Sequence, residues 1–309
     1  MKYTLSLLLM LLFVATGKLA AQEPSSPQDV ITFEVGAMRI SALSEGQQSG
    51  GTSVLLGATP AMLQKYAPDG SYPSAVNAFM VRSATQNVLI DAGFGRKLFD
   101  NLQALGLAAE QVNAVLLTHM HGDHIGGLLR GDTAAFPNAT LYIAQAEHDY
   151  WTSDKAMQAA PENRRGSFRQ ACKVVAAYKG RLRLFTPDKL GEAPSADLLP
   201  AGIQPIAAYG HTPGHTAYLL QSEGSRLLVW GDLTHAMPIQ VPHPEVSVTY
   251  DVDPQQAAAT RRQVLEYVAK NKIPVGGMHI AFPAIGNLKV GTEEAYTFDP
   301  FCDCLAVNN

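Results

Sequence analysis

Residues 118 to 127 read Thr118-His119-Met120-His121-Gly122-Asp123-His124-Ile125-Gly126-Gly127. This stretch follows the apolar run 112–117, which is typical of a strand covered on both faces. At the end of such a strand, His119 and His121 can face one metal ion while Asp123 and His124 turn toward a second. Only 9 of the 309 residues are histidine. Three of them beside an aspartate and three glycines therefore indicate a metal site rather than a solvated loop.

Three further candidate ligands also follow predicted strands. The segment 210–216, with the sequence GHTPGHT, places His215 on a rigid turn before the next strand. Asp232 follows the apolar run 227–230, and His279 comes after the apolar segment 273–275. Each feature alone is weak, but a shared position at strand ends predicts that these side chains converge. His211, His148 and His243 lack this pattern in combination and are interpreted as structural or surface histidines.

The residue types suit a binuclear zinc centre. Imidazole and carboxylate groups bind Zn²⁺ well, and a catalytic site leaves one position open for water. Two ions about 3.5–4 Å apart need a bridging anion, for which Asp232 is the natural candidate beside a shared hydroxide. We therefore predict two Zn²⁺ ions, with other divalent metals left open, and seven protein ligands: His119, His121, Asp123, His124, His215, Asp232 and His279. Asp123 and Asp232 are also the candidate catalytic residues.

In this order along the chain, the motifs resemble the metallo-β-lactamase superfamily. Asp91-Ala92-Gly93 and the segments 118–127, 135–139 and 279–286 are most similar to methyl parathion hydrolase and its relatives. The resemblance runs from about residue 31 to the C-terminus. It implies an α+β fold, the αββα sandwich, in which two β-sheets are flanked by helices and the metals lie at the edge between the sheets.

The resemblance also distributes the ligands between the ions. It implies that His119, His121 and His215 hold one ion, that Asp123, His124 and His279 hold the other, and that Asp232 is shared. Asp91 would support the histidine loop from behind, which matches the need of metal ligands for oriented partners.

The remaining pattern predicts the elements of this fold. Alternation over 31–43 indicates an opening β-hairpin, and the Gly-, Ser- and Pro-rich stretch 44–74 indicates a long surface loop with a short helix near 61–66. Asp253 and Pro254 supply the first residues of a helix with an apolar face. Strands are expected at 78–81, 87–90, 112–117, 140–144, 181–185, 203–209, 216–221, 226–230 and 273–275, and further helices at 145–151 and 163–179. Strands and helices do not alternate strictly, so a layered α+β sandwich fits best.

The N-terminus predicts export. Lys2, an apolar run over 5–14 and the small residues Ala20 and Ala21 have the order of a secretory signal peptide over 1–21. A flexible tail over 22–30 and one hydrolase domain over 31–309 would follow, because no linker or internal repeat divides the rest. The mature protein is expected to be periplasmic or secreted, without stable membrane insertion after cleavage. An uncleaved N-terminal anchor is left open.

The composition of the chain limits which classes of partner it can bind. Without Lys2 and Lys18 the chain has 21 basic and 27 acidic residues, a balance that argues against nucleic acid. Cys172, Cys302 and Cys304 are too few for a disulfide framework. The pair at 302 and 304 is interpreted as tail residues, with a strained disulfide or a metal ligand as alternatives. The oligomeric state, including a homodimer, is left open.

The resemblance implies hydrolysis of a small-molecule ester-type bond, in an aryl phosphotriester, an aryl ester or a lactone, by a metal-bridging hydroxide. No G-x-S-x-G motif suggests a serine nucleophile instead. Methyl parathion hydrolase relatives use aromatic side chains to line the substrate pocket. The candidates for that pocket are Trp151, Phe94, Phe99, Phe168 and His235.

Several alternatives remain open. Lactonases of the superfamily have a tyrosine shortly after the bridging aspartate, where this chain has Leu233-Thr234-His235. Glyoxalase II, a thioesterase, shares all seven ligand types but adds a basic C-terminal region, and most β-lactamases of the superfamily lack the full ligand set. Flavodiiron-type proteins carry a glutamate at the position of His121. A metal-binding protein without catalytic activity is the non-enzyme alternative.

Overall fold

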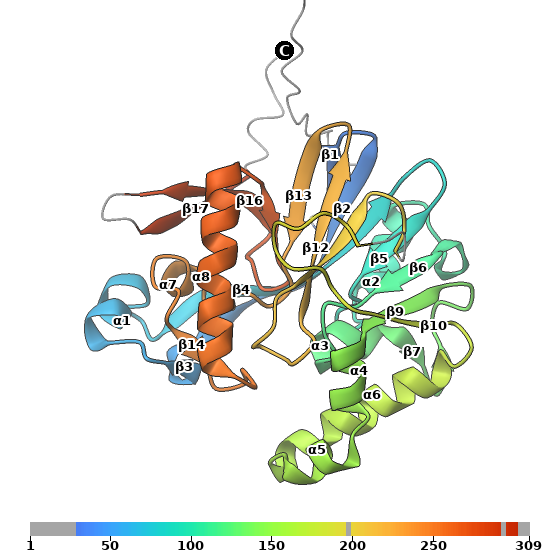
Figure 1. Cartoon of the computed structure of the whole chain (residues 1–309), viewed down its shortest axis with the longest axis horizontal. Coiled ribbons are helices and arrows are strands. Elements are labelled where there is room, and N and C mark those ends of the chain that lie inside the picture. The colour runs from blue at the N-terminus through green and yellow to red at the C-terminus, as the bar shows by residue number, and fades with distance from the viewer. Residues whose placement is uncertain (1–28, 196–198, 292–294, 302–309) are drawn as a thin grey trace, which may run out of the picture.

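The computed structural model describes residues 29–195, 199–291 and 295–301 (Figure 1). Two β-sheets lie face to face, and helices cover their outer faces, so the predicted αββα sandwich is confirmed. The sheets have seven and six strands, and two short two-stranded sheets accompany them.

The seven-stranded sheet is built from the N-terminal part of the chain. Its strands, in spatial order, are β1 (Val30–Val35), β2 (Met38–Gly51), β4 (Ser71–Arg82), β5 (Asn87–Ile90), β6 (Ala114–Leu116), β9 (Thr140–Ala144) and β10 (Leu182–Phe185). From β1 to β5, each strand is antiparallel to its neighbour. From β5 to β10, each strand is parallel to its neighbour. The carboxyl ends of these parallel strands therefore lie at one edge of the sheet.

The six-stranded sheet is built from the C-terminal part. Its order is β11 (Ile203–Ala207), β12 (Thr216–Ser222), β13 (Ser225–Val229), β15 (Val275–Gly276), β16 (Ile285–Val290) and β17 (Tyr296–Pro300). The short pairs are β3 (Leu55–Leu56) with β14 (Ser247–Val248), and β7 (Leu129–Arg130) with β8 (Thr133–Ala134).

Three buried apolar layers hold the sandwich together. Between the sheets, Phe79 and Leu116 of the first sheet belong to the same buried cluster as Tyr218 and Val229 of the second. The outer face of the first sheet packs against α2 (Leu98–Ala104) and α6 (Arg165–Ala177), and that of the second against α8 (Pro254–Asn271). Burial of this apolar area is the main term that favours the folded chain.

The other helices lie around the edge where the two sheets meet. They are α1 (Pro60–Tyr66), α3 (Gly122–Ile125), α4 (Gln145–Trp151), α5 (Asp154–Ala159) and α7 (Met237–Gln240). Figure 1 shows α4, α5 and α6 together at the lower right, below the ends of β9 and β10. The Asp253 side chain accepts a hydrogen bond from the Gln256 N–H and caps α8, as the sequence predicts.

The predicted loop over 44–74 is wrong in extent. β2 continues to Gly51 and β4 begins at Ser71, so only residues 52–70 connect them. The second half of β2 is rich in Gly, Ser and Gln and partly exposed, so it shows no apolar alternation. The hairpin of β16 and β17 near the C-terminus was also not predicted from the sequence. The helix near 61–66 is confirmed by α1.

The predicted signal peptide, most of the flexible tail, Cys302 and Cys304 lie outside the described residues and stay predictions. In the ranges that the structure describes, no helix is both long and apolar enough to cross a membrane.

Candidate metal centre

The histidines and aspartates named above gather at the shared edge of the two sheets. His119 and His121 lie on the loop that follows β6 of the first sheet. The second sheet supplies three loops: the loop after β11 carries His211, the loop after β13 carries Asp232 and the loop after β15 carries His279. Residues that are far apart in the sequence are thus brought together at the ends of strands, as we expected.

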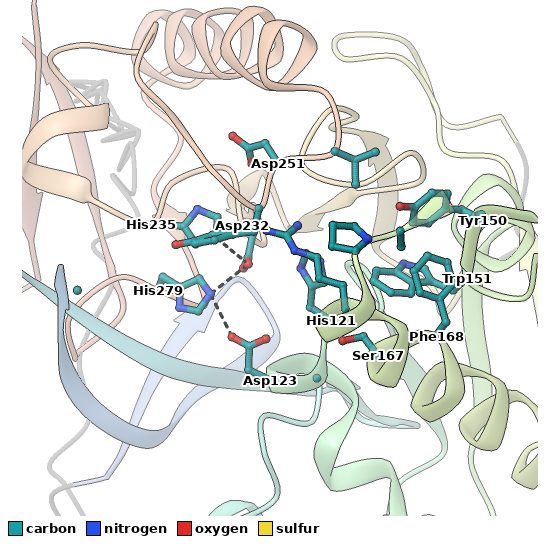
Figure 2. A pocket seen from close by; sticks show the side chains of 18 of the residues that line it. His121, Asp123, Tyr150, Trp151, Ser167, Phe168, Asp232, His235, Asp251 and His279 are labelled. Carbon is teal, nitrogen blue, oxygen red and sulfur yellow. Dashed lines mark hydrogen bonds and ion pairs between the residues drawn. The ribbon is translucent and has the colours of Figure 1, made fainter. Parts of the chain in front are cut away.

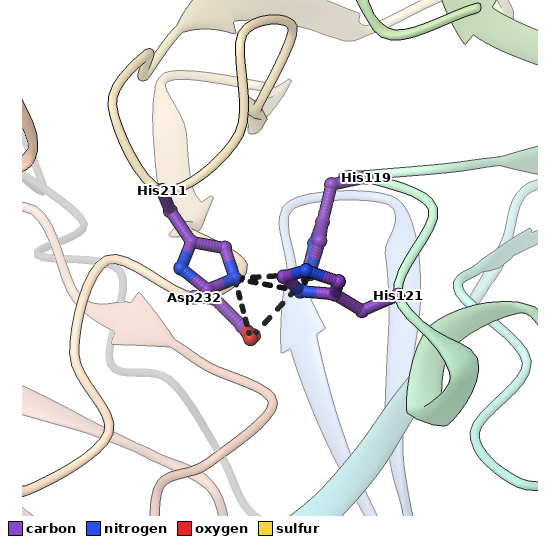
Figure 3. Close-up of side chains that lie close together, drawn as sticks. All are labelled: His119, His121, His211 and Asp232. Carbon is purple, nitrogen blue, oxygen red and sulfur yellow. Dashed lines mark hydrogen bonds and ion pairs between the residues drawn. The ribbon is translucent and has the colours of Figure 1, made fainter. Parts of the chain in front are cut away.

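The first group of potential ligands consists of three histidines and one carboxylate (Figure 3). Nε2 of His119 lies 2.8 Å from Nδ1 of His121, and Nε2 of His211 lies 3.2 Å and 3.0 Å from these two atoms. The nearest oxygen of Asp232 is 3.4 Å from His211 Nε2. A neutral imidazole carries a proton on only one of its two nitrogens, so the three ring nitrogens that face one another here cannot all be paired by hydrogen bonds. A cation among them would be ligated by all three.

The second group consists of Asp123, His124 and His279. His279 Nε2 lies 3.5 Å from an oxygen of Asp123, and His124 Nε2 lies 3.8 Å from the other oxygen. Asp123 comes from α3 directly after the histidine loop, so one short segment supplies ligands to both groups.

Asp232 joins the two groups. Its Oδ2 lies 3.6 Å from His119 Nε2 and 3.0 Å from His279 Nε2, and its Oδ1 lies 3.2 Å from His124 Nε2. The side chain is 2% exposed. One buried carboxylate therefore faces nitrogen atoms of both groups, which is the geometry that a bridging ligand requires.

The structure does not bring His215 into this cluster and places His211 there instead. His215 Nδ1 donates to the Ala208 carbonyl at 2.8 Å, and its Nε2 accepts from the Asp232 backbone N–H at 3.0 Å. Both ring nitrogens are thus used by the backbone. This geometry corrects the prediction of His215 as a ligand and the interpretation of His211 as a structural or surface histidine. His148 and His243 lie outside the cluster beside acidic side chains.

His211 is oriented by Asp251, a residue for which the sequence offered no signal. Its Nδ1 lies 2.8 Å from Oδ1 of this carboxylate, which also accepts a hydrogen bond from the Val248 N–H at 3.0 Å. Asp251 is 6% exposed. An imidazole held this way presents its other nitrogen to a metal, as ligand histidines in proteins do.

Asp91 supports the histidine loop from behind. It accepts hydrogen bonds from the Thr118 N–H at 2.8 Å, from the Thr118 hydroxyl at 2.6 Å and from His124 Nδ1 at 2.7 Å. Its own φ is +56°, a strained conformation for a residue with a side chain. These three hydrogen bonds fix both Thr118, which follows β6, and the ring of His124.

Glu147 of α4 is a second buried carboxylate that sequence reasoning missed. One oxygen accepts from the Met120 N–H at 2.9 Å and from Trp151 Nε1 at 2.6 Å. The other accepts from the Thr212 hydroxyl at 2.6 Å and from the Gly214 N–H at 3.0 Å. Glu147 therefore ties both histidine loops to one helix.

Burial keeps the first group of histidines neutral. It is the main reason that the pKa of His119, His121 and His211 lies well below the usual range. Since a metal binds the neutral imidazole, these three rings are ready to act as ligands at neutral pH.

The second group is dominated by carboxylates. Burial would lower the pKa of His279, but Asp232 and Asp123 outweigh it and raise that pKa to about 9. Burial would likewise raise the pKa of Asp232, yet the surrounding histidines hold it well below its usual range. His124 Nε2 and Asp232 Oδ1 are buried and lie 3.2 Å apart, and neither has a hydrogen-bond partner elsewhere among the described residues. An imidazole nitrogen and a carboxylate oxygen that face each other in this way fit a site that binds cations.

A cavity of about 700 Å³ opens onto the cluster (Figure 2). Asp123, Asp232, His235 and His279 line one end of it. Tyr150, Trp151 and Phe168 form an aromatic wall at the other. Ala156, Ala159 and Ala160 also line the cavity. The cavity can therefore hold a small molecule with a polar group at the cluster and an apolar group against the wall.

Two of the five candidate pocket residues lie elsewhere. Phe94 is 40% exposed and packs under the Arg96 guanidinium, while Phe99 of α2 stacks on Phe136. Neither is among the residues that line the cavity. Their assignment to the pocket is thus corrected. Phe99 belongs to α2, which packs on the outer face of the first sheet, and the Phe94 side chain is exposed to solvent before that helix begins. Trp151, Phe168 and His235 do line it.

Comparison with known proteins gives a consistent result. A family model described as "Metallo-beta-lactamase superfamily" matches residues 71–272. The crystal structure of the hydrolase AbOPH in the β-lactamase superfamily superposes with a TM-score of 0.79 at 28% identity, over 90% of this chain and 99% of that one. The dizinc quorum-quenching lactonase AidC, in complex with its product, gives a TM-score of 0.78 at 26% identity, over 88% and 97% of the two chains.

Among curated proteins, the hydroxyacylglutathione hydrolase of Aeromonas hydrophila is 35% identical over 83 residues, which are 25% of this chain and 30% of that protein. The chain spans less than two thirds of the length of the curated relatives that it matches first.

Proposed function

The chain belongs to the metallo-β-lactamase superfamily, and from this membership we propose that it is a binuclear metal-dependent hydrolase that cleaves ester-type bonds in small molecules. The observation that carries the proposal is the position of Asp232, whose two oxygens face different histidine groups. A carboxylate so placed can hold two cations close together. The ion near His119, His121 and His211 and the ion near Asp123, His124 and His279 would share it.

The donor set favours zinc. Imidazole nitrogens outnumber carboxylates, and the histidines are oriented by backbone carbonyls or carboxylates behind them. Bound ions of this kind supply a water of lowered pKa and polarise the oxygen of the bond under attack. The similar protein AidC is a dizinc lactonase, which supports this choice of metal.

Asp123 and Asp232 would have different roles in the reaction. Asp123 lines the cavity and its side chain is 24% exposed, whereas that of Asp232 is 2% exposed. Burial would raise the pKa of Asp123, but His124 and His279 lower it below the usual value, so the carboxylate is ionised at neutral pH. Asp123 can therefore accept a proton from water that enters the cavity, while Asp232 keeps the two groups together.

The substrate is proposed to be an ester, a lactone or an aryl phosphotriester with an apolar substituent. The aromatic wall formed by Tyr150, Trp151 and Phe168 supports this choice, because it offers apolar surface opposite the cluster. Similarity to the lactonase AidC supports a lactone or a related ester as well. A thioester is the competing substrate, favoured by the match to a hydroxyacylglutathione hydrolase.

A hydrolysis panel with zinc-loaded protein tests the proposal. It contains an aryl phosphotriester, an aryl ester, an acyl-homoserine lactone, a cephalosporin and lactoyl-glutathione. We expect turnover of at least one of the first three substrates, lost with chelator and in Asp232→Ala. Turnover that survives both treatments would remove the metal-dependent mechanism, and exclusive turnover of lactoyl-glutathione would replace the ester with a thioester.

A further inference from the structure

One basic side chain that lines the cavity belongs to none of the metal groups. Among the described residues that line the cavity, Arg164 is the only one with an arginine or lysine side chain. It ends the 3₁₀ turn Glu162–Arg164 and directly precedes α6, whose Ser167 and Phe168 line the cavity as well. Arg164 therefore belongs to the side of the cavity that carries the aromatic wall.

A hydrogen bond to a second segment holds the Arg164 side chain in place. Arg164 is half-buried, and its Nη2 donates to the Thr249 carbonyl at 3.0 Å. The residues after Thr249, namely Tyr250 and Asp251, line the cavity too. Oδ1 of Asp251 lies 2.8 Å from Nδ1 of His211, a member of the first metal group. Arg164 thus joins the segment of the aromatic wall to the loop that reaches the metal groups.

The positive charge of Arg164 has no counter-charge in the described part of the chain. The three carboxylates that line the cavity, Asp123, Asp232 and Asp251, face histidines instead. α6 has no acidic residue in its first turn, and the N-terminal end of a helix disfavours a nearby cation. Neither an ion pair nor the helix dipole therefore stabilises this guanidinium, which suits a side chain whose partner is a ligand.

The guanidinium keeps most of its hydrogen-bonding capacity. The bond to Thr249 uses one of its five N–H groups, and the others have no partner among the described residues. Two neighbouring N–H groups in one plane match the two oxygens of a carboxylate. The hydroxyl of Ser167, in the first turn of α6, belongs to the same wall (Figure 2). This side of the cavity therefore offers both apolar surface and a group that binds a carboxylate.

We propose that Arg164 is a specificity-determining residue that binds a carboxylate of the substrate. The preferred ester would have its scissile bond at the metal groups, an apolar spacer against the aromatic wall and the carboxylate at the far end of that spacer. This assignment rests on the proposed function and narrows its substrate class to esters with an anionic group away from the bond that is cleaved.

The test uses two aryl esters of equal length. The mono-4-nitrophenyl ester of adipate carries a free carboxylate, and the corresponding methyl 4-nitrophenyl diester is neutral. Zinc-loaded wild type, Arg164→Gln, Arg164→Lys and Arg165→Gln are compared by the ratio of kcat/KM for the charged and the neutral ester. Arg165 is the matched control, because it donates to the Ala160 and Gln158 carbonyls and is not among the residues that line the cavity.

A binding measurement accompanies the kinetics and requires no turnover. The Kd values of adipate and monomethyl adipate are measured by calorimetry on the same zinc-loaded proteins. Both probes offer one carboxylate to the metal groups, so the difference between them reports the second carboxylate.

The wild type and Arg165→Gln are expected to prefer the charged ester about 10-fold, through a lower KM, and to bind adipate about 10-fold more tightly than monomethyl adipate. Arg164→Gln should lose both preferences while it hydrolyses the neutral ester like the wild type. Arg164→Lys should keep part of them, because it retains the charge without the planar fork. The wild-type preference should shrink as NaCl rises from about 0.05 M to about 0.5 M, since salt screens a half-buried ion pair.

Equal kcat/KM for the two esters in the wild type would overturn the assignment, and so would a preference that survives in Arg164→Gln. Loss of the preference in Arg165→Gln would overturn it too, because the effect would then come from the charge of the helix end. If neither ester is hydrolysed but adipate binds more tightly than monomethyl adipate only when Arg164 is present, the carboxylate site stands and the proposed ester hydrolysis falls. Equal Kd values without turnover would remove both.

Discussion

At the scale of single residues, the choice between His211 and His215 decides which side chains can hold metal. Both flank the same Pro213-Gly214 turn, four residues apart, and both are buried. His211 points its Nε2 at His119 and His121, whereas His215 binds two backbone groups. One ring is thus a candidate ligand, and the other stabilises the loop that carries Asp232.

His211→Ala and His215→Ala should therefore fail in different ways. His211→Ala is expected to lose one zinc equivalent and at least about 100-fold in activity, more than typical losses of a residue behind a ligand. His215→Ala should keep both ions but unfold more easily by about 1–3 kcal/mol, because the Ala208 carbonyl and the Asp232 N–H lose their partner. Zinc analysis and urea unfolding distinguish them. The reverse pattern would reinstate His215 as the ligand.

Gly231 allows His215 to approach the Asp232 loop. Its φ is +62°, and a Cβ atom there would overlap Nε2 of His215. Gly224, in the turn from β12 to β13, has a φ of +79° with open space around it. Either substitution by Ala should cost about 1–3 kcal/mol for the backbone conformation. Gly231→Ala should cost about 1–3 kcal/mol more for overpacking.

Urea unfolding of both glycine variants without metal measures this difference. Equal losses of stability in Gly231→Ala and Gly224→Ala would show that His215 does not pack against the Asp232 loop as described.

At the scale of secondary-structure elements, strand ends are what the sequence predicts best. Apolar runs before the histidine loop, Asp232 and His279 correctly indicate strands, and their carboxyl ends meet at one edge of the sandwich. The Asp253 cap and the helix that follows it were also predictable from local chemistry. The strands β16 and β17 and the second half of β2 were missed, because partly exposed strands lack a continuous apolar run.

Contacts between elements were not predictable in the same way. Glu147 is one acidic residue among many in the sequence, and only the fold shows that it joins α4 to both histidine loops. The same holds for Asp251, whose carboxylate contacts His211. These residues have no shared spacing, since each contact links segments far apart in the chain.

Glu147→Gln tests whether this junction stabilises the site. The amide would place an N–H₂ group against two of the four donors that now face the carboxylate, leaving them unpaired. We expect a loss of about 1–3 kcal/mol in the free energy of unfolding and weaker zinc binding. Glu192→Gln, at an exposed position beside Lys189, is the matched control and should behave like the wild type. Identical stability of the two variants would deny Glu147 this role.

At the scale of the whole molecule, each sheet supplies one side of the centre. The first sheet presents the loop from His119 to His124, and the second presents His211, Asp232 and His279. Packing of the two sheets through their shared core therefore sets the distance between the metal groups. Stability of the sandwich and metal binding should be linked, because bound metal stabilises only the folded state.

This linkage should depend on pH. The pKa of His279 is raised to about 9 beside Asp232, so its proton stabilises the metal-free fold below the ordinary value near 6.5. That contribution is lost as pH rises through about 9. Zinc needs the neutral ring, so its affinity should rise over the same range. Thermal unfolding between pH 6 and pH 10, with and without zinc, measures both trends.

A metal-free protein that gains stability from pH 6.5 to pH 9 would contradict the assigned His279 environment. His279→Gln removes one titrating ring and should weaken this pH dependence. Part of it should remain, because burial would lower the pKa of His124 but Asp232 and Asp91 outweigh it and raise that pKa as well.

The central claim is that two metal ions, shared by Asp232, carry the activity. The most direct measurement is a zinc titration of chelator-stripped protein in which bound metal and hydrolysis of the best panel substrate are followed together. We predict that activity rises with bound zinc and reaches its maximum at two equivalents, while Asp232→Ala stays inactive at saturating zinc. Full activity at zero or one equivalent would contradict the claim.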